Sequence, residues 1–137
     1  MIAAPARVAF REVSSSDPTV AAWAQRLLAQ SPHFSHASDY LPGAWLGLYV
    51  EDRLLSAYGY THCKNGVVAV EYALCEPSKA GRVALEALTL TCCDLWKGRV
   101  VRFHCEIANR KIRKLVERLG AKPVAYMYEI IPEGHHG

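Results

Sequence analysis

The stretch NRKIRKLVERLGA, residues 109–121, carries the clearest structural pattern in the chain. Its apolar residues recur every three or four positions, as on one face of a helix: Ile112, Leu115, Val116 and Leu119. Gly120 follows directly, and glycine is common just past a helix C-terminus because it adopts the left-handed conformation at little cost. The pattern predicts a helix over Asn109–Leu119 whose apolar face packs inward.

The segments around this helix predict two strands and another helix. Arg99–Ile107 alternates between apolar residues (Val101, Phe103, Cys105, Ile107) and polar residues (Arg102, His104, Glu106). Val124–Ile131 is expected to form the last strand. Upstream, Arg82–Trp96 has apolar residues at helical spacing, and Gly98 ends it: Leu85, Leu88, Cys92 and Leu95.

The first half of the chain predicts one strand, one helix and a three-stranded meander. Arg7–Val13 has the pattern of a strand. Asp17 and Pro18 suit the N-cap and first turn of a helix that runs to Gln30. The apolar face of that helix is expected to contain Val20, Trp23, Ala24, Leu27 and Leu28.

The meander is expected from three strand-like runs joined by tight turns. These runs are Ala44–Glu51, Leu54–His62 and Val67–Cys75, with turns at Asp52-Arg53 and at Lys64-Asn65-Gly66. The whole order is β-α-β-β-β-α-β-α-β. This order predicts an α+β fold with a mixed, mostly antiparallel central sheet and helices on both faces.

Length and composition favour one globular domain over residues 1–137, with a frayed tail at 132–137. Hydrophobic residues make up 51% and charged residues 21%, which is enough apolar material for a core. No apolar run reaches the roughly 18 residues needed to cross a membrane, and the N-terminus lacks a signal-peptide pattern. We therefore expect a protein that stays in the cytoplasm, or inside a particle assembled there, without a membrane partner.

Charge and cysteine content limit the function classes further. The net charge of +3 is too small to predict nucleic-acid binding. Nine Lys and Arg residues lie in residues 97–122 against two Glu, and several of them cover the outer face of the last predicted helix. Such a run is usually a solvated face, but it also suits phosphates or an acidic partner. The five cysteines form no C-x-x-C pair, and we expect no metal site.

The element order and the stretch at 109–121 together resemble the GNAT (GCN5-related N-acetyltransferase) family. The family often has a helix of the form N-x-x-[small]-[aliphatic]-x-L-Y-x-x-L-G-[aromatic], and Asn109, Leu115, Leu119 and Gly120 match it. The likeness covers roughly residues 7–131 by element order. It implies the GNAT fold, acetyl-CoA as cofactor, and N-acetyl transfer to an amine carried by a small molecule or a protein.

The resemblance also implies where acetyl-CoA would bind. In this family the pantetheine arm enters a gap between the fourth and fifth strands, and the pyrophosphate meets the N-terminus of the next helix. The residues that correspond here are Cys75, Lys79, Gly81, Arg82, Val83 and Asn109. Ala80 or Ser78 stands where the family usually has Arg or Gln, and the branched Val83 is expected to crowd the backbone that approaches the phosphate.

Acetyl transfer needs a base for the amine and, in many members, an acid for the thiolate. The candidates for these roles are Glu71, Glu106, His104 and Tyr128. Each also has an ordinary structural explanation, such as a solvent-facing strand residue, a cross-strand salt bridge or aromatic packing. Val116 stands where the family's tyrosine acid would be.

Two functional hypotheses follow from this resemblance. The first is an acetyl-CoA-dependent N-acetyltransferase that acts by direct attack in a ternary complex. The second is a catalytically degenerate GNAT-fold protein with a binding or structural role and a protein partner. The eroded phosphate motif and Val116 motivate the second hypothesis. The small size is similar to that of phage-encoded GNAT-like products, including internal virion proteins and proteins that meet the host.

Overall fold

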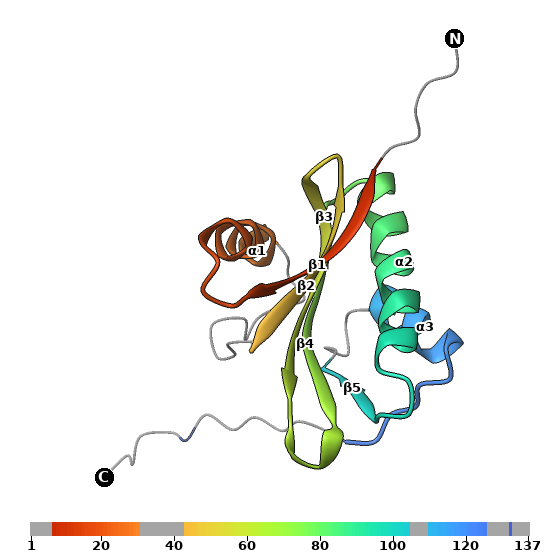
Figure 1. Cartoon of the computed structure of the whole chain (residues 1–137). Coiled ribbons are helices and arrows are strands. Elements are labelled where there is room, and N and C mark those ends of the chain that lie inside the picture. Colours follow the sequence, from red (N-terminus) through yellow and green to blue (C-terminus); the bar gives the residue numbers. More distant parts are fainter. Residues whose placement is uncertain (1–6, 31–42, 105–109, 126–131, 133–137) are drawn as a thin grey trace.

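The computed structural model describes residues 7–30, 43–104, 110–125 and 132. The elements, in chain order, are β1 (Val8–Ser14), α1 (Pro18–Gln30), β2 (Ala44–Val50), β3 (Arg53–His62), a 3₁₀ turn (Lys64–Gly66), β4 (Val68–Cys75), α2 (Lys79–Leu95), β5 (Val101–Phe103) and α3 (Arg110–Arg118). The sheet separates α1 on one face from α2 and α3 on the other (Figure 1). This arrangement confirms the predicted mixed α+β class with helices on both faces.

The five strands lie in the order β1-β2-β3-β4-β5, so the sheet follows the chain. β1 to β4 are antiparallel, and β5 pairs with β4 in parallel after the crossover through α2. The hairpin between β2 and β3 turns at Glu51 and Asp52, whose φ angles are 50° and 62°. The predicted turn at Asp52-Arg53 was therefore wrong by one residue, because Arg53 already pairs with Val50.

Apolar side chains fill both faces of the sheet. On the α2 face, the buried residues include Leu48, Tyr58, Tyr60, Val68, Val70, Leu88 and Cys92. On the α1 face they include Val20, Ala24, Leu27, Trp45, Ala57, Tyr72 and Leu74. The Tyr58 hydroxyl and Thr89 Oγ1 hydrogen-bond inside the α2 face, so the buried tyrosine keeps its polar end satisfied.

A β-bulge in β4 determines which side chains reach each face. The register shifts between Gly59 and Tyr60, and it leaves Glu71 as the extra residue on β4. Before the bulge, Val68 and Val70 lie on the α2 face. After it, Ala73 and Cys75 lie on that face, while Tyr72 and Leu74 pack toward α1.

Several predicted boundaries needed correction. α2 begins at Lys79 rather than Arg82, because Ser78 caps it and its Oγ accepts the Gly81 N–H at 3.0 Å. Leu95, predicted inward, is 57% exposed, and Trp96 occupies the core instead. No helix within the described ranges is long and apolar enough to span a membrane.

The C-terminal elements agree in part with the prediction. α3 spans Arg110–Arg118 with Ile112 and Val116 buried, but Leu119, predicted inward, is 42% exposed. Gly120 has the expected positive φ, at 97°. β5 is shorter than predicted within the described residues, and Cys105–Ile107 lie outside them. Val124 and Ala125 have no regular structure, and the rest of the predicted last strand lies outside the described residues.

Candidate active site

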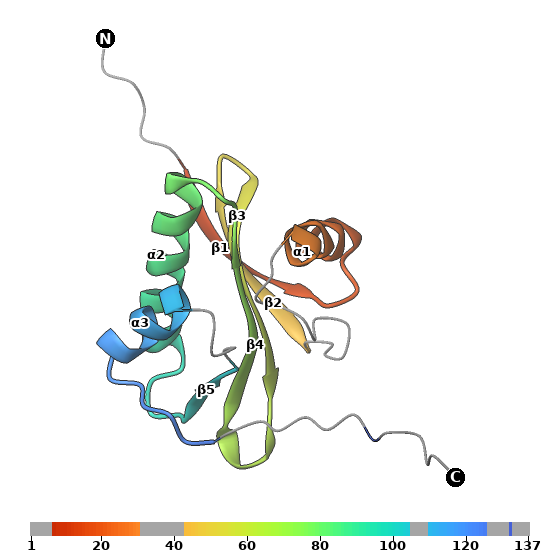
Figure 2. The same ribbon diagram turned by 180° about the vertical axis from the view of Figure 1, so that it is seen from behind.

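Among the described residues, β5 pairs along its whole length with the first three residues of β4. The pairs are Val68↔Val101, Ala69↔Arg102 and Val70↔Phe103. The His104 N–H adds a hydrogen bond of 2.9 Å to the Val70 carbonyl. β4 then continues to Cys75, and Figure 2 shows β5 beside only one end of it. Within the described residues, the second half of β4 therefore has no strand partner on the β5 side.

The bulge at Glu71 turns particular backbone groups toward that unpaired side. Val68 and Val70 bond toward β5 before the bulge, through the Val68 N–H and the Val70 carbonyl. The bulge inserts one residue, so the N–H and C=O groups of Ala73 and Cys75 face the β5 side after it. They form a short run of main-chain donors and acceptors that an extended ligand could pair with.

Glu71 directly follows the last described pair between β4 and β5, Val70↔Phe103. Its carboxylate accepts hydrogen bonds of 3.4 Å from Thr61 Oγ1, and Thr61 Oγ1 accepts the Gly43 N–H at 3.0 Å. Burial raises the pKa of the Glu71 carboxyl, while the nearby charge of His104 and the Thr61 hydrogen bond oppose that rise. Two candidates chosen separately, Glu71 and His104, are thus brought together.

The N-terminus of α2 lies directly beyond the end of β4. The Ser78 side chain caps the Gly81 N–H, and the Arg82 N–H bonds the Ser78 carbonyl at 3.0 Å. Among the described residues, none accepts a hydrogen bond from the N–H groups of Lys79 and Ala80. The Val83 side chain is 59% exposed. Its predicted crowding of a bound phosphate stays a prediction.

Gly81 is required here for a reason that the motif did not reveal. A Cβ built on Gly81 would lie 2.1 Å from the Glu76 carbonyl oxygen and 2.8 Å from its carbon. The first turn of α2 therefore packs against the backbone that leaves β4. Only glycine allows this approach, which fixes α2 close to the end of the unpaired strand.

Two cations from different helices face the end of β4. Burial raises the pKa of the Cys75 thiol, and the charges of Arg82 on α2 and Lys111 on α3 act against that rise. Both cationic residues are exposed. Lys111 also lines a shallow open hollow on α3 together with Lys114, Glu117 and Arg118. Positive charge thus extends from the α2 N-terminus onto α3.

Glu76 is a site residue that the sequence reasoning missed. Its Oε1 accepts a hydrogen bond from Trp23 Nε1 at 2.9 Å and an ion pair from Arg26 at 2.5 Å. Its N–H donates to the Leu55 carbonyl, and its carbonyl accepts the Ser78 N–H. One residue thus ties α1 to the junction between β4 and α2. Trp23 and Arg26, three positions apart on α1, were the signal for such a partner.

Comparisons with known proteins place this geometry in a known fold. No family model and no curated protein matches the sequence. A ribosomal-protein-alanine N-acetyltransferase from Brucella melitensis biovar Abortus 2308 superposes with a TM-score of 0.60 at 19% identity, covering 93% of this chain and 100% of that one.

Two aminoglycoside acetyltransferases superpose similarly. AAC(6')-Iy in complex with CoA gives a TM-score of 0.60 at 12% identity, over 98% of this chain and 100% of that one. Meta-AAC0020, from an uncultured soil metagenomic sample and in complex with trehalose, gives 0.61 at 9% identity, over 90% and 96%. This chain has the GNAT fold.

The GNAT fold confirms what the stretch at 109–121 predicted about architecture. Val116, at the position of the family's tyrosine, is 7% exposed, so this position on α3 faces the protein interior. The candidates Glu106, Tyr128 and Asn109 lie outside the described residues. Within those residues, no group of three or more His, Cys, Asp or Glu side chains could hold a metal ion.

Proposed function

We propose that this chain is an N-acetyltransferase that transfers the acetyl group of acetyl-CoA to an amine. The observation that carries the proposal is that, among the described residues, β4 has no strand partner on the β5 side after Val70↔Phe103, and Glu71 directly follows that pair. This stretch of β4 leads to the N-terminus of α2. A thioester arm and a carboxylate could therefore meet beside this stretch of main chain.

The residues around the gap suit the anionic and amide parts of CoA. The main-chain groups of Ala73 and Cys75 face the β5 side and could pair with the amides of the pantetheine arm. The N–H groups of Lys79 and Ala80 point from a helix N-terminus, where the helix dipole favours phosphate. Arg82 and Lys111 add charge in the same region.

Glu71 is proposed as the general base. The amine attacks the thioester carbon, the new C–N bond forms, and the C–S bond then breaks to release the CoA thiolate. Glu71 takes the proton of the incoming ammonium, directly or through a water. Burial raises its pKa toward neutrality, which makes it a better base than an exposed carboxylate. The charge of His104 acts in the opposite direction and lowers the pKa of Glu71.

The acceptor is proposed only as a primary amine. Trehalose, sisomicin and CoA are ligands of the structural neighbours. The non-catalytic alternative has no support of its own in the described residues, and it becomes one outcome of the test below. Under the enzymatic proposal, the positive charge on α3 binds the phosphates of CoA.

Calorimetric titration with acetyl-CoA tests the proposal, followed by thiol release in the presence of a panel of amines. We expect binding in the micromolar range, and the double variant Arg82→Gln/Lys111→Gln should weaken it by about tenfold or more. Lys64→Gln, an exposed cation in the turn before β4, should change nothing. Absence of heat at saturating acetyl-CoA would overturn the proposal, and binding without turnover on any amine would favour the non-catalytic alternative.

A further inference from the structure

β1 is an unusually regular edge strand. Among the described strands, the order of the sheet places it at one end, with β2 as its neighbour. Its register runs without interruption from Val8↔Val50 to Ser14↔Ala44, whereas the other two antiparallel pairs each contain a shift. Edge strands are usually protected by bulges, prolines or lysines. The sequence of β1, VAFREVS, has no proline or lysine, and its register contains no bulge.

The hydrogen-bond pattern shows which groups of β1 point outward. The Glu51 N–H donates to the Arg7 carbonyl at 2.9 Å, so Arg7 and every second residue after it bond toward β2. The alternate residues Val8, Phe10 and Glu12 therefore direct their N–H and C=O groups away from the sheet. In the part of the chain that the structure describes, none of these backbone groups has a partner.

The same outward residues expose apolar surface. Val8 is 57% and Phe10 43% exposed, and both lie on the α2 face because they pair with Val50 and Leu48. α2 packs over β2, β3 and β4, so these side chains lie beyond the area that the helix covers. Figure 1 is viewed onto this β1 edge, between the two helical layers.

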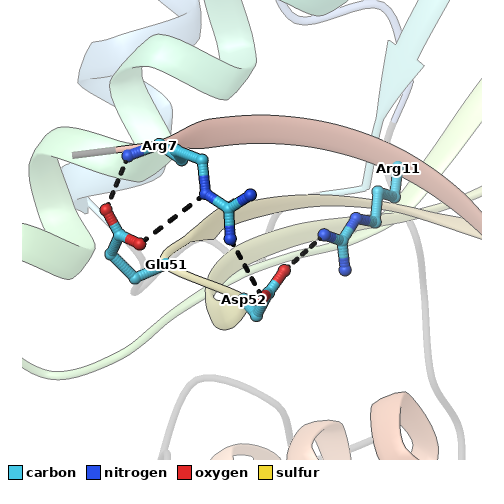
Figure 3. Close-up of polar contacts among 4 residues, drawn as sticks. All are labelled: Arg7, Arg11, Glu51 and Asp52. Carbon is cyan, nitrogen blue, oxygen red and sulfur yellow. Dashed lines mark hydrogen bonds and ion pairs between the residues drawn. The ribbon is translucent and has the colours of Figure 1, made fainter. Parts of the chain in front are cut away.

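Arg7, just before β1, and Arg11, within it, form ion pairs with the turn between β2 and β3. The Arg7 N–H donates to Glu51 Oε1 at 2.8 Å, and its guanidinium lies 3.6 Å from Asp52. Arg11 pairs with Asp52 at 2.7 Å and lies 4.6 Å above the Tyr49 ring centroid. Figure 3 shows both guanidinium groups directed at the turn residues. Their charge is thus compensated, which leaves the edge without effective repulsion.

We propose that β1 pairs antiparallel with β1 of a second copy of this chain, about a two-fold axis at Phe10. Phe10 of one copy then lies opposite Phe10 of the other, and Val8 lies opposite Glu12. Each of these pairs exchanges N–H and C=O groups that both point outward, as the ladder requires. Pairing about Arg11 would place two guanidinium groups opposite each other, which is unfavourable.

The axis is perpendicular to the sheet, so it joins the two sheets into one. The α2 helices of both copies lie on the same face, and the α1 helices lie on the other. Phe10 packs against its symmetry mate and buries the apolar surface that the monomer leaves open. A self-complementary strand of this kind needs no other partner, and it does not depend on acetyl transfer.

Analytical ultracentrifugation of the full chain between about 1 and 100 µM tests for the dimer. Phe10→Lys should raise the dimer dissociation constant about tenfold or more. Phe10→Pro should do the same, because it removes both the outward N–H and the aromatic ring, while the backbone bonds to β2 come from the neighbouring residues. The matched control is Val83→Lys, at an apolar residue on α2 that is 59% exposed against 43% for Phe10, which should leave the dimer unchanged.

Crosslinking tests the register, in a Cys63→Ser/Cys93→Ser/Cys105→Ser background that removes the two exposed thiols of the described residues and the one cysteine outside them. Phe10→Cys should form an intermolecular disulfide on oxidation, because the residue faces itself across the axis. Glu12→Cys should not, because it faces Val8. A wild-type chain that is monomeric throughout the concentration range would overturn the proposal. So would a dimer that survives both Phe10 variants, or one that crosslinks through Glu12→Cys but not Phe10→Cys.

Discussion

At the scale of single residues, Glu71 combines backbone and side-chain roles. It is the inserted residue of the bulge, the bulge places Ala73 and Cys75 on the α2 face, and Glu71 directly follows the last described pair with β5. Its carboxylate is half-buried between Thr61 and His104. The proposed base and the inserted residue of the bulge are therefore the same residue. Bulges often occur beside active sites for this reason.

Glu71→Gln is expected to lower kcat/KM by about 100-fold or more, because amide nitrogen and oxygen cannot accept the ammonium proton. In the wild type, the acidic limb of kcat/KM should lie above the ordinary glutamate pKa, since burial raises the pKa of Glu71. Steady-state kinetics across pH checks both points. Thr61→Val should move the acidic limb of kcat/KM to still higher pH, because it removes a hydrogen bond that lowers the pKa of Glu71. An unchanged rate in Glu71→Gln would exclude it as the base.

The same raised pKa has a consequence for stability with a definite sign. A carboxyl whose folded pKa exceeds its unfolded value stabilises the fold below the unfolded pKa, and this contribution is lost as the pH rises through the folded pKa. The melting temperature of Glu71→Gln relative to wild type should therefore be higher near pH 7.5 than near pH 4. Thermal melts of both proteins at the two values measure this difference. A constant difference would contradict the raised pKa.

Gly81→Ala is expected to destabilise the fold by about 1–3 kcal/mol, as overpacking does. The added methyl would lie 2.1 Å from the Glu76 carbonyl oxygen, which is backbone and cannot simply rotate away. Denaturant unfolding measures the change. Gly43→Ala is the control, because its methyl would lie 3.4 Å from the nearest atom, the Tyr60 carbonyl oxygen. Equal stability of the two variants would show that α2 can move away from Glu76.

At the scale of elements, Glu76 joins three of them. Trp23 and Arg26 of α1 bind its side chain, the Leu55 carbonyl of β3 accepts its N–H, and its own carbonyl accepts the Ser78 N–H at the α2 cap. Burial alone would raise the pKa of Glu76. The hydrogen bonds from Arg26 and Trp23 and the charges of Arg26 and Arg53 together outweigh burial and lower that pKa.

Glu76→Gln should reduce stability by about 1 kcal/mol at pH 7, since one charge-assisted contact is lost beside a half-exposed Arg26. The pKa of Glu76 is lower in the folded than in the unfolded state, so its ionised carboxylate stabilises the fold above the unfolded pKa. This stabilisation is lost as the pH falls through the folded pKa. The difference from wild type should therefore shrink near pH 3. Thermal melts at pH 7 and pH 3 measure it, with the exposed Glu86→Gln as control. A difference that persists at pH 3 would point to packing instead.

At the scale of the whole molecule, the positive region from the α2 N-terminus to α3 should make CoA binding depend on salt. Exposed charges act over about 8–10 Å at physiological ionic strength and less at higher salt. The dissociation constant of acetyl-CoA should therefore rise several-fold between about 50 and 500 mM salt. Calorimetry measures it, and Arg82→Gln/Lys111→Gln should flatten the dependence. A salt-independent affinity would place the phosphates away from these cations.

The sequence by itself determined the described elements and their order from β1 to α3, and the predicted last strand stays a prediction. Periods of two and of three to four residues reflect burial on one face of a strand or helix, and this is local information. The predictions for α1, α3 and the meander were accurate to within a few residues for that reason. Gly98, Gly120 and the pair Asn65-Gly66 adopt the positive φ angles that such positions need. The stretch at 109–121 predicted a helix through the same periodicity, and it indicated the fold through its resemblance to the GNAT motif at Asn109, Leu115, Leu119 and Gly120.

Only the tertiary structure decided how the site is assembled. The bulge at Glu71 arises from the pairing of β3 with β4, and the parallel pairing of β4 with β5 joins strands that are separated in the chain by α2. Contacts such as Glu76 with Arg26 join residues about 50 positions apart, which no local period encodes. The exposure of Val8 and Phe10 likewise depends on where α2 lies. Pairing register and long-range packing are collective, so they appear only once the chain has folded.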